Sequence, residues 1–176
     1  MQRRALLSSL VGGTVMVSGC ASNPFSTSST EVYNPTGMAT IRPIDTPIIQ
    51  HGLTTDSEQY LYARMFQPGE TLAVTDQPDA ENYAEAIDEL SGGEFAVFTN
   101  IRTAAAAPAY FWPADTEWRD GRLEITLERQ TASYDGTGDE VVGVALTRFN
   151  YEGDTPPGAD ILFPSGATIS VGQADR

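Results

Sequence analysis

Residues 117–128 of the chain are EWRDGRLEITLE, in which an Asp-Gly pair at 120–121 separates two extended runs. Asp-Gly between such runs is the strongest short-range signal for a β-hairpin, because both residues tolerate the positive φ angles of a tight turn. In the second run Leu123, Ile125 and Leu127 alternate with polar residues, which predicts a strand with one buried face. The stretch therefore indicates a protein built from strands.

Further stretches on both sides of this hairpin have the length and apolar content of strands. They are residues 58–66, 95–102, 141–149, 161–163 and 168–171. Apolar side chains lie on both sides of the alternation in 58–66, and 95–102 is a continuous apolar run. Both patterns predict strands that are covered on two faces. Loops rich in Gly and Pro, such as 135–138 and 155–158, separate the later strands.

One helix is expected between Asp79, as its N-cap, and Gly92, where it ends. Apolar residues recur there at helical spacing: Ala80, Tyr83, Ala84, Ile87 and Leu90. Many short strands with Gly/Pro turns and one short helix predict a mainly β fold. We expect a single β-sandwich-like domain, with a partly closed barrel as the alternative.

The composition is strongly acidic. The chain has 24 acidic and 10 basic residues, a formal net charge of −14 at pH 7, and all its basic residues are arginine. Such a charge keeps a protein soluble but loads the folded state with self-repulsion. Acidic surplus without lysine is typical of halophilic proteins. Concentrated salt screens the repulsion, because the Debye length falls to about 3 Å at 1 M. The same balance argues against a nucleic-acid partner, whose phosphates require clustered Lys and Arg.

Salt should therefore stabilise the folded domain. We expect its melting midpoint, followed by circular dichroism, to fall when multimolar chloride is replaced by dilute buffer. Equal midpoints in the two solvents would contradict the halophilic interpretation.

The first 20 residues, MQRRALLSSLVGGTVMVSGC, have the layout of a secretory signal. Arg3 and Arg4 form a short basic region, and a weakly apolar stretch follows at 5–17. That stretch is too short for a membrane-spanning helix, which needs about 20 residues. Arg3-Arg4 followed by leucines resembles the twin-arginine export signal. Residues 17–20, Val-Ser-Gly-Cys, resemble a lipobox, which implies that Cys20 carries a lipid.

These two motifs make the chain similar to small β-rich lipoproteins that haloarchaea export by the twin-arginine route. The resemblance implies a signal peptide at 1–19 and a lipidated Cys20 at the start of a Ser/Thr-rich tether, 20–31. It also implies an extracytoplasmic β-rich domain, 32–176, held by its lipid on the outer face of the cytoplasmic membrane. Cys20 is the one cysteine of the sequence, so we expect no disulfides.

The single histidine, His51, could be a general base, a metal ligand or an ordinary residue in a turn. No serine lies in a nucleophile elbow, and Cys20 is expected to be acylated. One histidine with scattered carboxylates has no metal-ligand spacing. We therefore predict no catalytic residue, no metal site and no cofactor.

Acidic residues in two loops, at 135–140 and at Asp154 and Asp160, fit either calcium ligation or ordinary turns. The loop from Asp135 to Glu140 lacks the glycine and distal glutamate of an EF-hand loop. Turns are therefore favoured. A pair of hydrolase carboxylates would need only suitable separation, and residue type alone selects no pair among 24 acidic residues.

The densest aromatic cluster is Tyr110, Phe111 and Trp112, with Trp118 just downstream. It could form a ligand or glycan platform or a protein-binding hot spot, but core packing is favoured. We expect a non-enzymatic binding or interaction module of the cell envelope, attached to the membrane by its lipid, with a protein or glycan partner. The alternatives are an extracytoplasmic hydrolase using paired carboxylates and a purely structural envelope protein.

Overall fold

The computed structural model describes residues 32–119, 122–152 and 156–172, with the side chains of 32–34 left out. The expected export signal with Arg3 and Arg4, the expected lipid attachment at Cys20 and the expected tether at 20–31 lie outside the described residues. In the described ranges, no helix is long and apolar enough to cross a membrane.

The described chain forms eight strands and one helix. In order they are β1 (Val32–Pro43), β2 (Leu61–Phe66), α1 (Ala80–Asp88), β3 (Glu94–Ala104), β4 (Ala109–Arg119), β5 (Arg122–Thr131), β6 (Glu140–Tyr151), β7 (Gly158–Leu162) and β8 (Thr168–Gly172). The first sheet has the order β1-β6-β3-β2 and the second β4-β5-β7-β8. All strand pairs are antiparallel except β5 and β7. The predicted β-sandwich-like domain with one short helix is confirmed.

The hairpin predicted from residues 117–128 is β4 with β5. The two strands are antiparallel and Arg119 lies opposite Arg122, so only residues 120–121 separate them. Leu123, Ile125 and Leu127 are buried, as their alternation predicts.

A buried apolar cluster fills the space between the two sheets. Phe95 of β3 and Phe149 of β6 stack with ring centroids 4.9 Å apart. From the second sheet, Phe111 meets Phe163 edge to face at 5.2 Å. The strands of both sheets contribute to this cluster: Met65, Phe95, Val97, Phe111, Leu123, Ile125, Leu127, Phe149, Ala159, Ile161, Phe163 and Val171.

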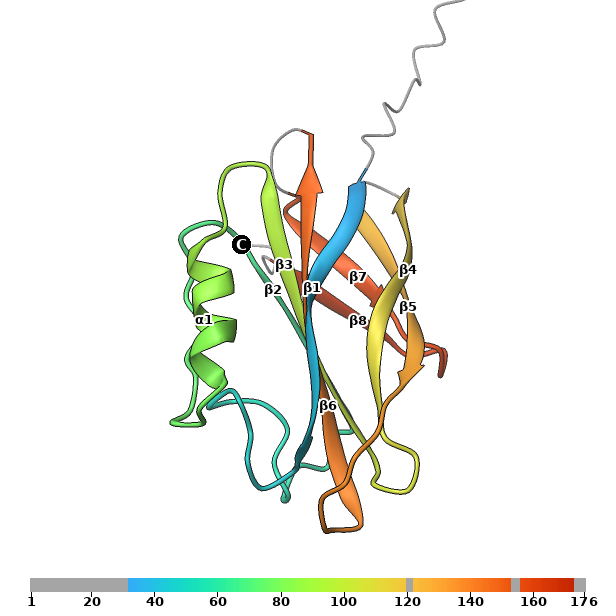
Figure 1. Ribbon diagram of the computed structural model, residues 1–176. Coiled ribbons are helices and arrows are strands. Elements are labelled where there is room, and N and C mark those ends of the chain that lie inside the picture. Colours follow the sequence, from blue (N-terminus) through green and yellow to red (C-terminus); the bar gives the residue numbers. More distant parts are fainter. Residues whose placement is uncertain (1–31, 120–121, 153–155, 173–176) are drawn as a thin grey trace, which may run out of the picture.

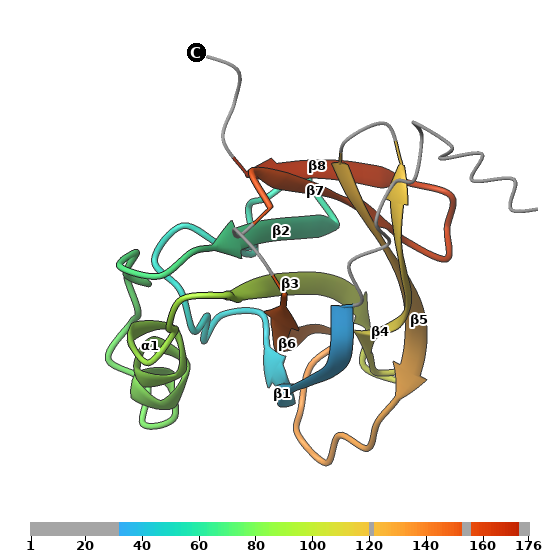
Figure 2. The same ribbon diagram turned by 90° about the horizontal axis from the view of Figure 1, so that it is seen from above.

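A second apolar cluster lies on the other face of the first sheet, between that sheet and α1. Figures 1 and 2 show α1 alongside this face. Phe98 of β3 is fully buried there, with the ring of Tyr83 from α1 at 6.1 Å and that of Tyr62 from β2 at 6.4 Å. Burial also raises the pKa of Tyr83 well above its ordinary value. The domain thus has three layers, and the first sheet is covered on both faces. This explains the continuous apolar run at 95–102.

Both ends of α1 differ from the prediction in their details. Asp79 is the N-cap residue, but its carboxylate makes no bond to the helix N–H groups. Both oxygens of Asp79 instead accept hydrogen bonds from Arg42, which ties the helix to β1. The left-handed residue after the helix is Gly93, with φ of 84°, rather than Gly92.

The sandwich is closed along one side by a close approach of β4 to β6. A Cβ atom on Gly143 of β6 would lie 1.8 Å from the carbonyl oxygen of Ala109 in β4. Only glycine permits this approach, because a side chain there would overlap the backbone of the facing strand. The opposite side of the sandwich is bounded by the edge strands β2 and β8.

Candidate functional site

A groove runs along the side of the sandwich where β2 and β8 are edge strands. Its first part, of about 610 Å³, is lined by residues 58–63 and by Ile169 of β8. A second part, of about 530 Å³, continues along β2 from Ala63. The lining of this second part is Ala63, Arg64, Met65, Gln67, Pro68, Glu70, Ser170, Val171 and Gly172. We call the two parts together the edge groove.

The edge groove lies beside the backbone of β2. Six consecutive residues, with side chains on both faces of the strand, line its first part. The Tyr60 carbonyl accepts a hydrogen bond of 2.9 Å from the Arg102 N–H, so Tyr60 and Tyr62 direct their backbone groups toward β3. Since hydrogen-bonding groups alternate along an antiparallel strand, Leu61 and Ala63 direct theirs away from β3, toward the groove.

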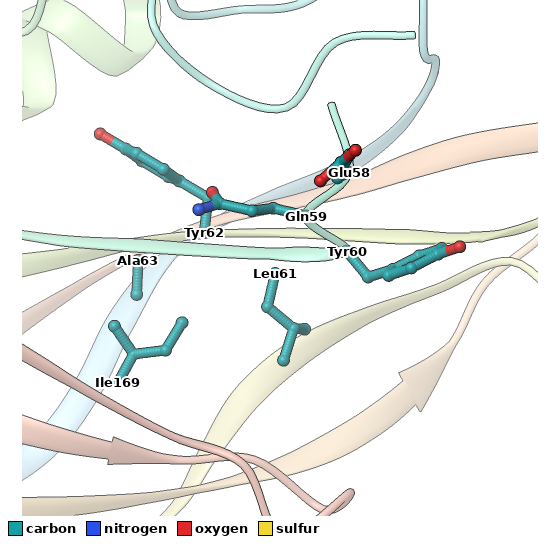
Figure 3. Close-up of a pocket in the computed structure, with 7 residues that line it drawn as sticks. All are labelled: Glu58, Gln59, Tyr60, Leu61, Tyr62, Ala63 and Ile169. Atoms are coloured by element: carbon teal, nitrogen blue, oxygen red, sulfur yellow. The ribbon is translucent and has the colours of Figure 1, made fainter. Parts of the chain in front are cut away.

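Side chains of two kinds border the groove. Leu61 and Ala63 point toward Ile169 of β8 and form an apolar floor, while Tyr62 and Gln59 lie on the other side of the strand (Figure 3). Tyr60 extends from the end of the strand and is 64% exposed, which makes it the one large exposed apolar side chain of the described residues.

The Arg102 side chain lies near the ring of Tyr60, just before β2 begins. Its guanidinium carbon lies 5.7 Å from the centre of the Tyr60 ring, within cation–π range. Arg102 also donates to the Glu140 carboxylate, and this hydrogen bond raises the pKa of Arg102 above its usual value. The guanidinium therefore stays charged and fixed beside one face of the ring.

β2 lacks the prolines and bulges that protect the edge strands β1 and β4. Proteins guard such edges with prolines, bulges, charges or short strands. β1 contains Pro35 and Pro43, β4 contains Pro113, and each has a bulge. β8 is only five residues long. Leu61–Phe66 has no proline and no register shift, and Arg64 is its one charged residue.

The four aromatic residues singled out in the sequence do not form one platform. Phe111 is buried between the sheets. Tyr110 and Trp112 lie on the outer face of β4, edge to face at 6.4 Å and half-buried. Trp118 packs against the inter-sheet cluster with Tyr151 at 5.8 Å.

A bulge causes this separation. Tyr110, Trp112 and Trp118 would share one face of an uninterrupted strand. The register between β4 and β5 shifts between Pro113 and Asp115, so the alternation reverses and Trp118 turns inward.

The chain matches no protein-family model, no curated protein and no solved structure. Functional assignment therefore rests on the geometry of its own residues.

The remaining candidates offer little chemistry. His51 is exposed in a turn, without a hydrogen-bond or ion-pair partner in the described residues. Glu140 is bound to Arg102, and Asp160 accepts hydrogen bonds from Arg122 and from Ser170. Asp154 lies outside the described residues. Within the described ranges, no group of three or more His, Cys, Asp or Glu side chains could hold a metal ion.

The edge groove also gives the hydrolase hypothesis little support. One carboxylate lines each part of it, Glu58 in the first and Glu70 in the second. Glu70 is already engaged, since its carboxylate accepts a 2.7 Å hydrogen bond from the Gln67 N–H. A glycosidase needs two carboxylates facing one substrate bond.

Sequence reasoning assigned residues 58–66 to a strand but missed this groove. A signal was present: residues 60–66, YLYARMF, contain no acidic residue and no proline in a chain with 24 acidic residues. Such a stretch is typical of a buried strand, and nothing local distinguishes that from an open edge.

Proposed function

We propose that this protein is a lipid-anchored, non-enzymatic interaction module of the cell envelope, which binds an extended segment of a partner protein along β2. One observation carries the proposal: the edge groove follows the outward backbone groups of Leu61 and Ala63 over an apolar floor. An added strand gains affinity from backbone hydrogen bonds and specificity from alternate side chains.

A protein segment fits this groove better than a glycan. Donors and acceptors along the β2 edge repeat at the spacing of a neighbouring strand. The floor of the first part, formed by Leu61, Ala63 and Ile169, has no side-chain donor or acceptor for sugar hydroxyls. The polar side chains of the groove lie at its borders. The membrane attachment through Cys20 is supported by the signal and lipobox alone.

Photo-crosslinking in native membranes tests the binding site. A photoreactive phenylalanine analogue at Tyr60, in multimolar chloride, is expected to crosslink the chain to a protein partner. The same analogue at Glu85, on the exposed face of α1, is the matched control and should give no such product. Equal crosslinking from the two positions, or none from Tyr60, would contradict the proposal.

A further inference from the structure

We infer that the segment bound in the edge groove is β2 of a second copy of this chain, paired antiparallel about a twofold axis at Tyr62. The inference rests on the proposed function, because it names the partner of the same groove. The first sheet of one copy would then continue across the twofold axis into the first sheet of the second copy.

The backbone pattern permits this pairing. With Tyr62 opposite its own counterpart, Leu61 lies opposite Ala63 of the second copy, and Ala63 opposite Leu61. These are the residues whose backbone groups point into the groove. Each such pair exchanges two hydrogen bonds in an antiparallel ladder. The chain bends at Glu58 and Tyr60, so the pairing begins at Tyr60 and stays within the straight part of the strand.

The side chains are complementary under the same symmetry. Tyr60 and Arg64 lie two residues on either side of Tyr62, so each faces the other across the axis. Arg64 has 46% of its side chain exposed, and its salt bridge to Glu70 is long, at 3.9 Å. Its guanidinium carbon lies 4.5 Å from the centre of the Phe66 ring, so pairing would exchange that ring for Tyr60 of the second copy. Arg102 is positioned near the Tyr60 ring at 5.7 Å. A second cation can bind the exposed remainder of that ring, because Tyr60 is 64% exposed.

The distribution of charge favours a second copy. Two molecules of net charge −14 repel one another over most of their surface. Residues 60–66, the part of the edge that pairs, carry one cation and no acidic side chain, while Glu58 and Glu70 line the groove on either side of it. This stretch is therefore where two acidic copies can approach. Because salt screens the remaining repulsion, the dimer should tighten as chloride is raised.

A disulfide tests the register in the full chain. The sequence contains no cysteine besides Cys20, so Tyr62→Cys supplies a new thiol on the axis. Residues opposite each other at a non-hydrogen-bonded position are close enough for a cross-strand disulfide. Mild oxidation of native membranes in multimolar chloride should give a reducible dimer. Thr168→Cys, on the free edge of β8, is the control and should stay monomeric.

Backbone donors test the pairing by another route. Ala63→Pro removes an outward N–H, while the hydrogen bonds that Tyr60 and Tyr62 make to β3 are unaffected. In sedimentation of the full chain in high salt, we expect the dimer dissociation constant to rise about tenfold or more. Thr168→Pro is the matched control, because it also removes an outward N–H from an edge strand. The Phe163 N–H donates to the Ala167 carbonyl at 2.9 Å, so the next residue, Thr168, directs its N–H away from β7. Circular dichroism checks that both variants fold.

The outcomes separate this inference from the proposed function. A monomer at every concentration, with crosslinks from Tyr60 to a different protein, would overturn the second-copy assignment and leave the binding module intact. A monomer without crosslinks would overturn both. A dimer unaffected by Ala63→Pro, or no disulfide from Tyr62→Cys in a folded chain, would place the contact elsewhere and overturn the inference.

Discussion

Gly143→Ala is expected to lower the free energy of unfolding by about 3 kcal/mol, at the upper end of the range for overpacked sites. The new Cβ would lie 1.8 Å from the Ala109 carbonyl oxygen, 2.8 Å from its carbonyl carbon and 2.9 Å from the Tyr110 Cα. All three are backbone atoms, so no side-chain rotation can relieve the overlap. β4 must instead move away from β6, which disturbs the closed side of the sandwich. Urea unfolding at constant, high potassium chloride measures the loss.

Gly92→Ala is the control for this prediction. No heavy atom lies within 4 Å of its added Cβ, and Gly92 is not among the glycines with positive φ. A change within about 1 kcal/mol of wild type is expected, with slight stabilisation from the less flexible unfolded chain. Similar losses in both variants would show that the cost comes from glycine replacement in general rather than from the contact of β4 with β6.

Cys20→Ser is expected to move the protein from the membrane fraction to the medium or to an unanchored fraction. The change removes the thiol that the lipobox resemblance marks for acylation. Even one acyl chain gives only marginal membrane binding, with an association constant of about 10⁴ M⁻¹. A chain that has lost its whole lipid should therefore not stay attached. Fractionation with immunoblotting in high salt measures the distribution.

Ser22→Ala, two residues beyond the position where we expect the lipid, is the control and should remain in the membrane fraction. The same fractions can be treated with a lipase or labelled with a fatty acid to detect the lipid directly. If Cys20→Ser stays with the membrane while its signal is intact, the anchor assignment fails, although the edge groove and its tests are unaffected.

Local patterns were sufficient where a strand or helix depends on its own residues. The Asp-Gly turn with Leu123, Ile125 and Leu127 predicted the β4–β5 hairpin, and the apolar run at 95–102 predicted β3. β1 was missed, and so was β4 beyond its hairpin end, because prolines interrupt their alternation. Those prolines are tolerated because both strands lie at sheet edges. There a residue whose nitrogen faces solvent does not need an N–H to donate to a neighbouring strand.

The candidate site was harder to predict. The aromatic cluster in the sequence was separated by a one-residue bulge near Pro113, which no periodicity reveals. Tyr60 and Tyr62 belonged to a correctly predicted strand, yet their role depends on what lies beside that strand. The resemblance of residues 1–20 to an export signal and lipobox predicts an address for the domain, and Cys20→Ser tests it.

The sequence by itself determined the strand content, the single helix and the acidic charge, because each follows from neighbouring residues. Only the tertiary structure decided which strands became edges. β2 pairs with β3 on one side, with Leu61 opposite Ile101. Its other side has no partner strand among the described residues and borders the groove that Ile169 of β8 also lines. Strand pairing of this kind joins residues far apart in the chain, so no local pattern records it. The same run of apolar residues would be core in a central strand and forms an edge of the first sheet here.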